Sequence, residues 1–289
     1  MSDEAAALIA KKFIARKDVV AVQRKTGAWS PLLVDPRDTA SERIPWKMKH
    51  LRDHVDGKAT YGHYLLGTDD SCKLFAFDID LEANKPVTDS SDGFQGSWVD
   101  VMHPDKPEIN LDELSWAVKA IDPREAWHKY YTPGADRQRR PIVQMTVAMR
   151  TMANRLARNV AVMLELPVAV AYSGSKGLHV YGFTGEVPAD EAREAGLAVL
   201  EESGFHASRG ANFFKSNDED HYSGERNFTV ELFPKQTTLD GKDLGNLMRL
   251  PLGKNQRGGE GFFIDSHAPY TELVAADPIK AMTEGNPWA

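Results

Sequence analysis

The chain has 289 residues, 42% of them hydrophobic and 27% charged, with a formal net charge of −7. This composition excludes a collagen-like or disordered chain, and no apolar run approaches the length of a membrane span. The single cysteine, Cys72, excludes an intrachain disulfide and a cysteine-rich zinc module, and the first residues lack a signal-peptide pattern, so we expect a soluble cytoplasmic protein of about two modules.

The first third of the chain alternates helical and strand patterns. Apolar residues recur at helical spacing over residues 3–17, whereas the runs YGHYLL and KLFAFDID have the composition of strands. The pair Asp69 and Asp70 marks the turn between these two strands. We expect, in order, a helix at 3–17, a strand at 18–23, a helix at 43–55 and strands at 61–66 and 73–80.

The rest of the chain begins with a long irregular segment. Residues 83–112 are rich in Pro, Gly, Ser and Asp without a hydrophobic period, which is typical of a functional or disordered insertion. A long helix should follow from about Pro141 to before Pro167. We then expect a hairpin of 168–173 and 178–183, a helix at 188–203 and a strand at 228–233. The pattern predicts an α+β fold, with an antiparallel sheet covered by helices on one face.

The strand KLFAFDID carries two carboxylates on one face. Because side chains alternate along a strand, Asp78 and Asp80 share one face and the phenylalanines occupy the other. The strand FTVELF repeats this design with Glu231. If the two strands are neighbours, three carboxylates converge, and Mg²⁺ or Mn²⁺ would relieve their repulsion. A solvated D-x-D beside an unrelated glutamate is the simpler interpretation of the same residues.

The turn of the predicted hairpin, YSGSKGLHVY, has the composition of a phosphate site. Two glycines flank Ser175 and Lys176, and His179 lies two residues beyond Gly177. Glycine lets backbone N–H groups approach an anion, and hydroxyl, ammonium and imidazole groups can donate to phosphate oxygens. The spacing is not that of a Walker loop, and a strand follows instead of a helix. A histidine in a strand is more often structural, so the turn and the carboxylates have to be considered together.

Three blocks, in order, resemble the archaeo-eukaryotic primase superfamily, the primase-polymerases. They are the D-h-D strand FAFDID, the hairpin SGSKGLH and the late acidic strand TVELFPKQ. The hairpin is also similar to that of the polymerase domain of bacterial end-joining ligases. The surrounding runs resemble primase domains of mobile elements still more closely, including those of TOTE-type conflict systems. The resemblance covers roughly residues 50–255.

This resemblance implies an RRM-like catalytic sheet joined to an N-terminal α/β module, the archaeo-eukaryotic primase fold. We place the N-terminal module at 1–72, the catalytic module at 73–258 with an insertion at about 83–125, and a tail packed on the core at 259–289. Many relatives also carry a zinc module or a fused helicase, and we expect neither in this chain.

The resemblance also implies roles for individual residues. The implied metal ligands are Asp78, Asp80 and Glu231, with Asp240 or Asp243 next in line because many relatives have aspartate as the third ligand. The implied contacts to the incoming triphosphate are Ser173, Ser175, Lys176 and His179, and further phosphate or base contacts are Arg249 and Lys254. His179 is also a candidate catalytic residue, as a proton donor to pyrophosphate.

A group of arginines without acidic neighbours lies before and within the predicted long helix. Its members are Arg137, Arg139, Arg140, Arg150, Arg155 and Arg158. Phosphate contacts by such residues supply most of the non-specific affinity for nucleic acid, so we expect a template track here. An ordinary solvated helix face explains the same residues equally well.

Together these features predict a template-dependent nucleotidyltransferase, a DNA primase or primase-polymerase. It would make or extend primers on single-stranded DNA from NTP or dNTP, with two Mg²⁺ or Mn²⁺ ions and no zinc, and with a separate replicative helicase as a further partner. One alternative is a gap-filling repair polymerase that cannot initiate chains. Another is a non-catalytic RRM-like module, although its carboxylates would repel RNA and the aromatic RNP pattern is missing. A metal-dependent nuclease also uses clustered acids but does not require the hairpin.

Overall fold

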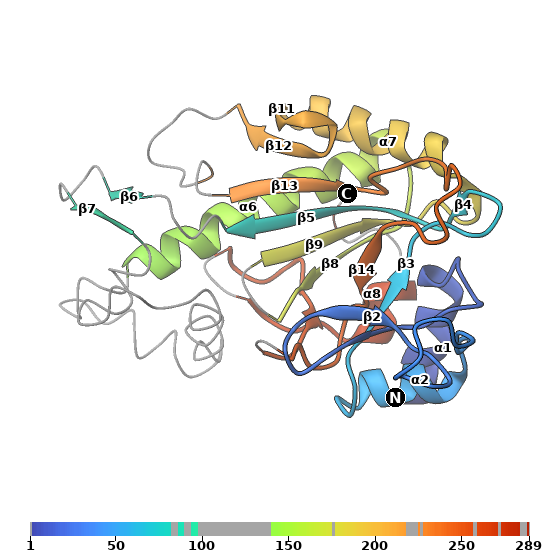
Figure 1. The fold of residues 1–289 in the computed structure, drawn as a ribbon. Helices are drawn as coiled ribbons and strands as arrows, with labels where there is room; N and C mark the ends of the chain where they lie inside the picture. Colours follow the sequence, from blue (N-terminus) through green and yellow to red (C-terminus); the bar gives the residue numbers. More distant parts are fainter. Residues whose placement is uncertain are drawn as a thin grey trace.

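The structure is a computed structural model of the chain (Figure 1). The residues that it describes are 2–81, 86–89, 94–97, 140–174, 177–217, 225, 228–256, 259–270, 273–283 and 288.

A seven-stranded antiparallel sheet forms the centre of the molecule (Figure 1). Its strand order is β11-β12-β13-β5-β9-β8-β15, and each neighbouring pair is antiparallel. The strands are β5 (Phe75–Leu81), β8 (Val168–Tyr172), β9 (Gly177–Gly182), β11 (Phe205–Arg209), β12 (Phe213–Ser216), β13 (Phe228–Phe233) and β15 (Phe262–Phe263). The strand predicted to carry Asp78 and Asp80 is therefore in the middle of the sheet.

Four of these strands and two helices have RRM-like topology. In the chain they follow the order β5-α6-β8-β9-α7-β13, with α6 at Arg140–Met163 and α7 at Ala189–Glu202. In the sheet they stand in the order β13-β5-β9-β8, the arrangement of a split βαβ fold. Both helices contact β5 and each other, so they cover the same face, which lies behind the sheet in Figure 1. The predicted α+β class, with helices on one face, is confirmed.

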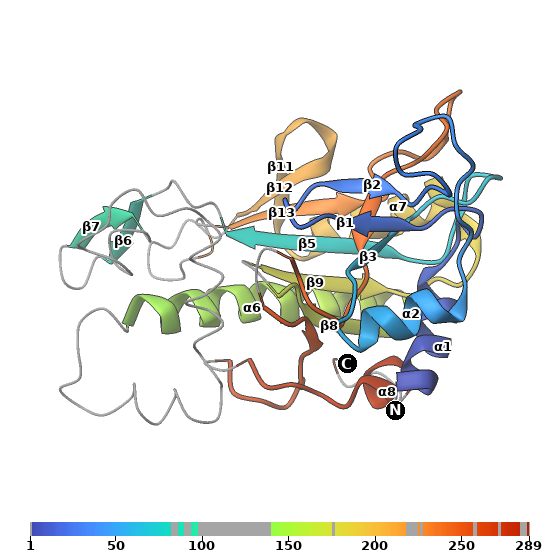
Figure 2. The same cartoon turned by 60° about the horizontal axis from the view of Figure 1, so that its bottom comes forward.

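A second, four-stranded sheet lies beside the first, with strand order β14-β3-β1-β2 (Figure 2). Its strands are β1 (Ala21–Gln23), β2 (Trp29–Pro31), β3 (Tyr61–Tyr64) and β14 (Leu247–Arg249), and the helices near it are α1 (Ser2–Phe13) and α2 (Met48–Val55). Strand β14 comes from the expected catalytic module, and β15 of the large sheet comes from the expected tail. The chain thus crosses the module boundaries that we placed after residues 72 and 258.

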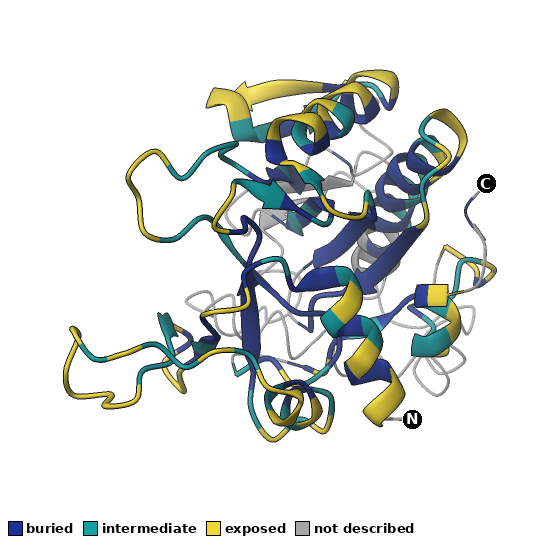
Figure 3. Ribbon diagram, turned by 90° about the vertical axis from the view of Figure 1, so that its right-hand side faces the viewer, coloured by how far each residue is buried: buried dark blue, intermediate teal, exposed yellow. Residues whose placement is uncertain are grey.

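The main cluster of buried hydrophobic residues has members in both sheets, and Figure 3 shows the buried residues in dark blue. Phe13, at the end of α1, packs edge-on against Tyr181 and Phe183 of the large sheet, with ring centroids 5.0 and 5.3 Å apart. Because Phe13 is only 1% exposed, its burial contributes about 2 kcal/mol. The N-terminal helix therefore covers part of the sheet face that α6 and α7 leave uncovered.

The remaining elements are short. They are β4 (Ser71–Cys72) paired with β10 (Val187–Pro188), β6 (Pro86–Asp89) paired with β7 (Phe94–Ser97), the 3₁₀ turn η2 (Gly210–Asn212), and α8 (Pro278–Thr283), which packs on α1. The predicted insertion at about 83–125 lies outside the described residues, apart from β6 and β7. Within the described residues, no helix is both long enough and apolar enough to cross a membrane.

Candidate functional site

A row of ionisable side chains crosses three central strands of the large sheet. Asp78 on β5 stands directly opposite Glu231 on β13 and, on its other side, opposite His179 on β9. Directly opposed residues of antiparallel strands have their side chains on the same face. The two acidic strands are neighbours, which is the condition on which the convergence of their carboxylates depended, and the register also places Asp80 on this face, two positions along β5. We call Glu231, Asp78 and His179 the central row.

The imidazole of His179 is held from both sides. Its Nε2 is 3.3 Å from Oδ1 of Asp78, and its Nδ1 is 2.8 Å from the hydroxyl oxygen of Tyr181. The Tyr181 hydroxyl and Nδ1 thus share a hydrogen bond, while Nε2 lies close to the Asp78 carboxylate. Burial raises the pKa of Tyr181, so this hydroxyl keeps its proton. The arrangement directs Nε2 of His179 toward Asp78 in the central row.

Glu231 has a cationic neighbour that our sequence interpretation did not include. The ammonium of Lys235 is 2.5 Å from Oε1 of Glu231 and lies 4.6 Å from the ring centroid of Phe233. The backbone N–H of Lys235 donates to the side chain of Asn246 at 2.8 Å, which positions the residue just after β13 ends. The only sequence signal was a lysine in the run ELFPKQ, because strand alternation cannot place a residue beyond the strand.

The hairpin between β8 and β9 closes tightly beside the row. The backbone N–H of Ser173 donates to the carbonyl of Gly177 at 3.0 Å, and the N–H of Gly177 is 3.3 Å from Oγ of Ser173. Gly177 also stands opposite Asp80, so the base of the turn adjoins the second aspartate. The predicted triphosphate contacts Ser175 and Lys176 lie outside the described residues.

Gly177 is where two strands approach too closely for a side chain. A Cβ atom at this position would lie 2.0 Å from the carbonyl oxygen of Ile79 and 2.7 Å from Oδ1 of Asp80. Real Cβ atoms essentially never make such contacts, so only glycine fits here. The glycine that the sequence suggested for anion binding thus also lets β9 approach Asp80.

Arg249 is buried beside the start of the hairpin turn. Its guanidinium, 8% exposed, donates to the carbonyl oxygens of Ser173, Leu252 and Gly253 at 3.1, 2.7 and 2.8 Å. Burial lowers the pKa of Arg249 to about 10, so it remains charged at neutral pH. Arg249 thus holds the start of the hairpin turn against the loop that follows β14, and its contact with a phosphate or base stays a prediction. Lys254 of that loop is exposed.

These features place the three sequence blocks in contact on one sheet face. The sequence matches the family model described as TOTE conflict system, Archaeo-Eukaryotic Primase domain, over residues 4–277. The chain belongs to this family. The resemblance drawn from the blocks is therefore confirmed, and the match extends well beyond residues 50–255. A search of curated proteins found no match to the sequence.

In this primase domain, one arginine of the expected template track is buried. Arg150 is 1% exposed and donates to the backbone carbonyls of Asp265 and Ala268. It anchors the segment after β15 to α6, so the expectation that Arg150 contacts the template was wrong. The helical spacing of Arg150 and Arg158 suggested a polar stripe, but the tail of the chain covers the position of Arg150.

The other arginines of the expected track differ in their surroundings. Arg155 is 32% exposed and forms an ion pair of 2.7 Å with the buried Glu225, while its guanidinium packs 4.9 Å from the ring of Phe205. Arg158 is exposed. Arg137 and Arg139 lie outside the described residues, as does the side chain of Arg140, the first residue of α6.

The carboxylates of the central face are paired with protein groups. Among the described residues, no three His, Cys, Asp or Glu side chains are arranged to hold a metal ion as they stand. Asp78 faces the His179 imidazole, and Glu231 faces Lys235. The donor chemistry suits Mg²⁺ or Mn²⁺, because hard cations prefer carboxylate oxygens. Binding to Glu231 would compete with Lys235 for the same oxygen.

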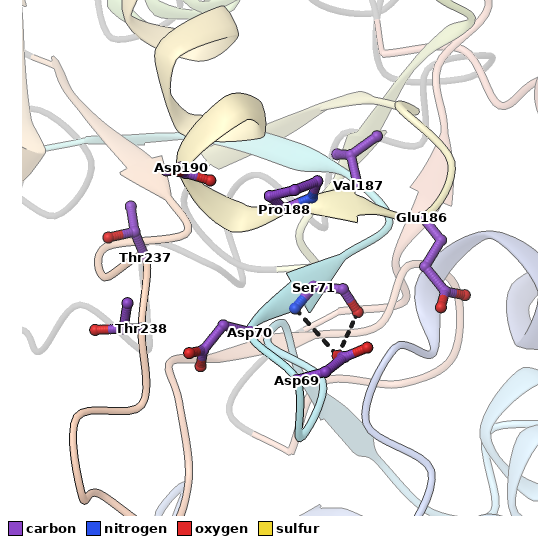
Figure 4. Close-up of a pocket in the computed structure, with 9 residues that line it drawn as sticks. All are labelled: Asp69, Asp70, Ser71, Glu186, Val187, Pro188, Asp190, Thr237 and Thr238. Atoms are coloured by element: carbon purple, nitrogen blue, oxygen red, sulfur yellow. Dashed lines mark hydrogen bonds between the residues drawn. The ribbon is translucent and has the colours of Figure 1, made fainter.

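A separate acidic pocket lies near the other end of β5, where β4 and β10 pair (Figure 4). Its lining residues are Asp69, Asp70, Ser71, Glu186, Val187, Pro188, Asp190, Thr237 and Thr238. Asp69 accepts hydrogen bonds from the backbone and hydroxyl of Ser71, and Asp70 accepts one from the backbone of Leu239. Two of the four carboxylates thus stabilise the predicted turn and its neighbouring loop.

Proposed function

We propose that this protein is a template-dependent nucleotidyltransferase that makes or extends primers on single-stranded DNA. The observation that carries the proposal is the central row, in which Glu231, Asp78 and His179 stand opposite one another on three adjacent strands. The hairpin turn at Gly177 adjoins Asp80 at the same place. An acidic face next to a glycine-rich turn suits a nucleoside triphosphate whose charge is shared with divalent cations.

In this proposal, each group has a separate task. Ser173 and the turn that it closes bind the triphosphate, together with Ser175 and Lys176. With a proton on Nε2, His179 would donate to a phosphate oxygen, and its hydrogen bond with Tyr181 keeps the imidazole in that orientation. Transfer of a nucleotidyl group needs positioning and charge neutralisation and no protein nucleophile.

Asp78, Asp80 and Glu231 are the proposed ligands of two Mg²⁺ or Mn²⁺ ions. Bound there, divalent cations would lower the pKa of the attacking 3′-hydroxyl and neutralise charge on the departing pyrophosphate. Binding can be measured without catalysis, by Mn²⁺ titration monitored by electron paramagnetic resonance. We expect Asp78→Asn to lose bound Mn²⁺, while replacement of the exposed Asp56 by Asn leaves binding unchanged. Equal Mn²⁺ binding by both variants would contradict this ligand assignment.

The substrates belong to the same proposal. They are a single-stranded DNA template and NTP or dNTP, and a separate replicative helicase is a proposed partner. A gap-filling polymerase would use the same site on a primed template. Chain initiation differs from primer extension because a second nucleotide must occupy the place of the primer terminus.

The decisive experiment compares unprimed and primed single-stranded templates with labelled ribo- and deoxyribonucleotides in Mg²⁺ and in Mn²⁺. We expect short products from the unprimed template, with more product in Mn²⁺ because its coordination is more forgiving. Extension of the primed template alone would favour the gap-filling polymerase. No product from either template, despite DNA binding, would contradict the enzyme and favour a non-catalytic binding module.

A further inference from the structure

The central row continues across two more strands. On β12, Phe213 stands directly opposite Glu231, and on β11, Arg209 stands directly opposite Phe213. These side chains therefore lie on the same face as the carboxylates. The register between β11 and β12 shifts just before Arg209, an irregularity of the kind that re-aims a side chain at a sheet edge.

Phe213 combines partial exposure with two nearby cations. The guanidinium carbon of Arg209 is 5.4 Å from the Phe213 ring centroid, and the ammonium of Lys235 is 5.8 Å from it. Both distances are within the range of cation–π attraction. The next residue, Phe214, is 5% exposed on the opposite face of the strand, whereas Phe213 is only partly buried. The strand thus buries one phenylalanine in the core and leaves the other beside two positive charges.

The charges around Phe213 indicate which ligand fits. The chain has a net charge of −7, and the carboxylates next to Phe213 repel phosphates. Arg209 supplies positive charge at this edge of the row, and Lys235 does so beside its ion-pair partner Glu231. An aromatic ring with adjacent cations is how proteins bind single-stranded nucleic acid, because bases stack on the ring while the cations contact phosphates.

We propose that Phe213, Arg209 and Lys235 form a platform that binds single-stranded DNA beside the central row. One base stacks on the partly exposed ring of Phe213, and the flanking phosphates contact Arg209 and Lys235. The bound DNA would thereby run toward the carboxylates of Asp78 and Glu231. That the bound DNA serves as a template rests on the proposed function, whereas the binding of DNA to the platform does not.

Binding can be measured apart from catalysis by fluorescence anisotropy of a labelled oligo-dT, in EDTA and without nucleotides. We expect Phe213→Ala to weaken binding by about tenfold, since stacking contributes about 1–3 kcal/mol per base. Phe213→Tyr should retain affinity, and Phe213→Leu, which keeps the volume but removes the aromatic face, should lose it. The matched control is Tyr270→Ala, because Tyr270 is 36% exposed and lies 5.6 Å from an arginine, Arg150, on α6 behind the sheet.

The salt dependence of DNA binding tests the proposed phosphate contact of Arg209. Arg209→Gln should reduce the slope of log K against log salt by about 0.7, the value for one contact to a single strand. Replacement of the exposed Arg37 by Gln, in the loop after β2, should leave the slope unchanged. Melting temperatures of all variants establish that each one folds.

The outcomes separate this inference from the proposed function. Wild-type affinity in both Phe213→Leu and Arg209→Gln would overturn the platform, as would an equal loss of affinity in the Tyr270 and Arg37 controls. Platform-dependent DNA binding in a protein that incorporates no nucleotide would support the platform and contradict the proposed enzyme.

Discussion

Tyr181 and His179 lie on the same face of β9, and the phenol of Tyr181 is 2.8 Å from Nδ1 of His179. Tyr181 is fully buried and packs against Phe13 of the N-terminal helix, with ring centroids 5.0 Å apart. Helix α1 is therefore connected to the central row through the side chains of Phe13 and Tyr181.

Tyr181→Phe should lower nucleotide incorporation about fivefold, because the hydrogen bond that orients His179 contributes about 1 kcal/mol. The matched control is Tyr172→Phe, which removes another buried phenol from the neighbouring strand β8. The ¹⁵N chemical shifts of His179 provide a second measurement, since loss of its Nδ1 partner should change the tautomer population. Unchanged shifts and activity in Tyr181→Phe would show that Tyr181 does not position the imidazole.

Asp78→Asn and Asp80→Asn should each abolish detectable incorporation while the protein stays folded. Each change removes a proposed metal ligand and also a negative charge from a face with three carboxylates, so the melting temperature should not fall. Incorporation and thermal unfolding are measured on the same preparations, with Asp56→Asn as the exposed control. Substantial activity in either variant would contradict the role of its aspartate in catalysis.

Glu231→Gln tests the third ligand. The register places Glu231 opposite Asp78, whereas Asp240 is exposed on the loop before β14 and Asp243 pairs with Arg43. We expect Glu231→Gln to lower incorporation at least about a hundredfold and to raise the Mn²⁺ concentration required. Asp240→Asn should behave as the wild type in the same metal titration. Wild-type behaviour of Glu231→Gln together with a loss in Asp240→Asn would instead identify Asp240 as the third ligand.

Gly177→Ala should destabilise the protein and inactivate it. The added methyl would lie 2.0 Å from the Ile79 carbonyl oxygen, so β5 and β9 would have to separate next to Asp80. We expect a loss of about 2 kcal/mol or more in the free energy of unfolding. Gly185→Ala is the comparison, because nothing lies within 4 Å of its added methyl and only the positive φ of 75° opposes it. Similar unfolding curves for the two variants would contradict the close approach at Gly177.

His54 should make the fold sensitive to acid. Its ring is fully buried between the backbone N–H of Tyr61 and the carbonyl of Pro251, both at 3.0 Å, and burial lowers its pKa to about 3. The unfolded chain takes up this proton below about pH 6.5, whereas the folded protein does not until about pH 3. The contribution of neutral His54 to the free energy of unfolding is therefore complete above pH 6.5. It decreases as the pH falls, by about 2 kcal/mol at pH 5.

Urea unfolding at pH 7, 6 and 5 measures this dependence. His54→Asn should flatten the slope of unfolding free energy against pH, and His206→Asn, a change at an exposed histidine, should not. If His54→Asn does not fold, proton uptake on unfolding of the wild type, measured by calorimetry in two buffers, replaces it. An uptake near zero at pH 5 would contradict the assignment.

Local sequence pattern was sufficient for the elements that carry the central row. The alternation in KLFAFDID and FTVELF predicted two strands with their acidic residues on one face, and the structure has both as β5 and β13. The long helix and the β8–β9 hairpin were also predicted, because helical periodicity and glycine turns depend on residues close in sequence. Strands β11 and β12 were not predicted, since four of the five residues of β11 are exposed and its sequence does not alternate.

The family and the placement of acidic residues on one face of two strands could be read from the sequence alone, because they depend on residue types at fixed spacing. Only the tertiary structure decided that Asp78 stands between Glu231 and His179, that Arg150 and Arg249 donate to buried carbonyls, and that Phe213 extends the row. The physical reason is that strand register and the burial of a long side chain are set by contacts between segments distant in the chain. An arginine has the same local sequence pattern whether it faces solvent or a carbonyl of the chain's own tail, and packing alone determines which.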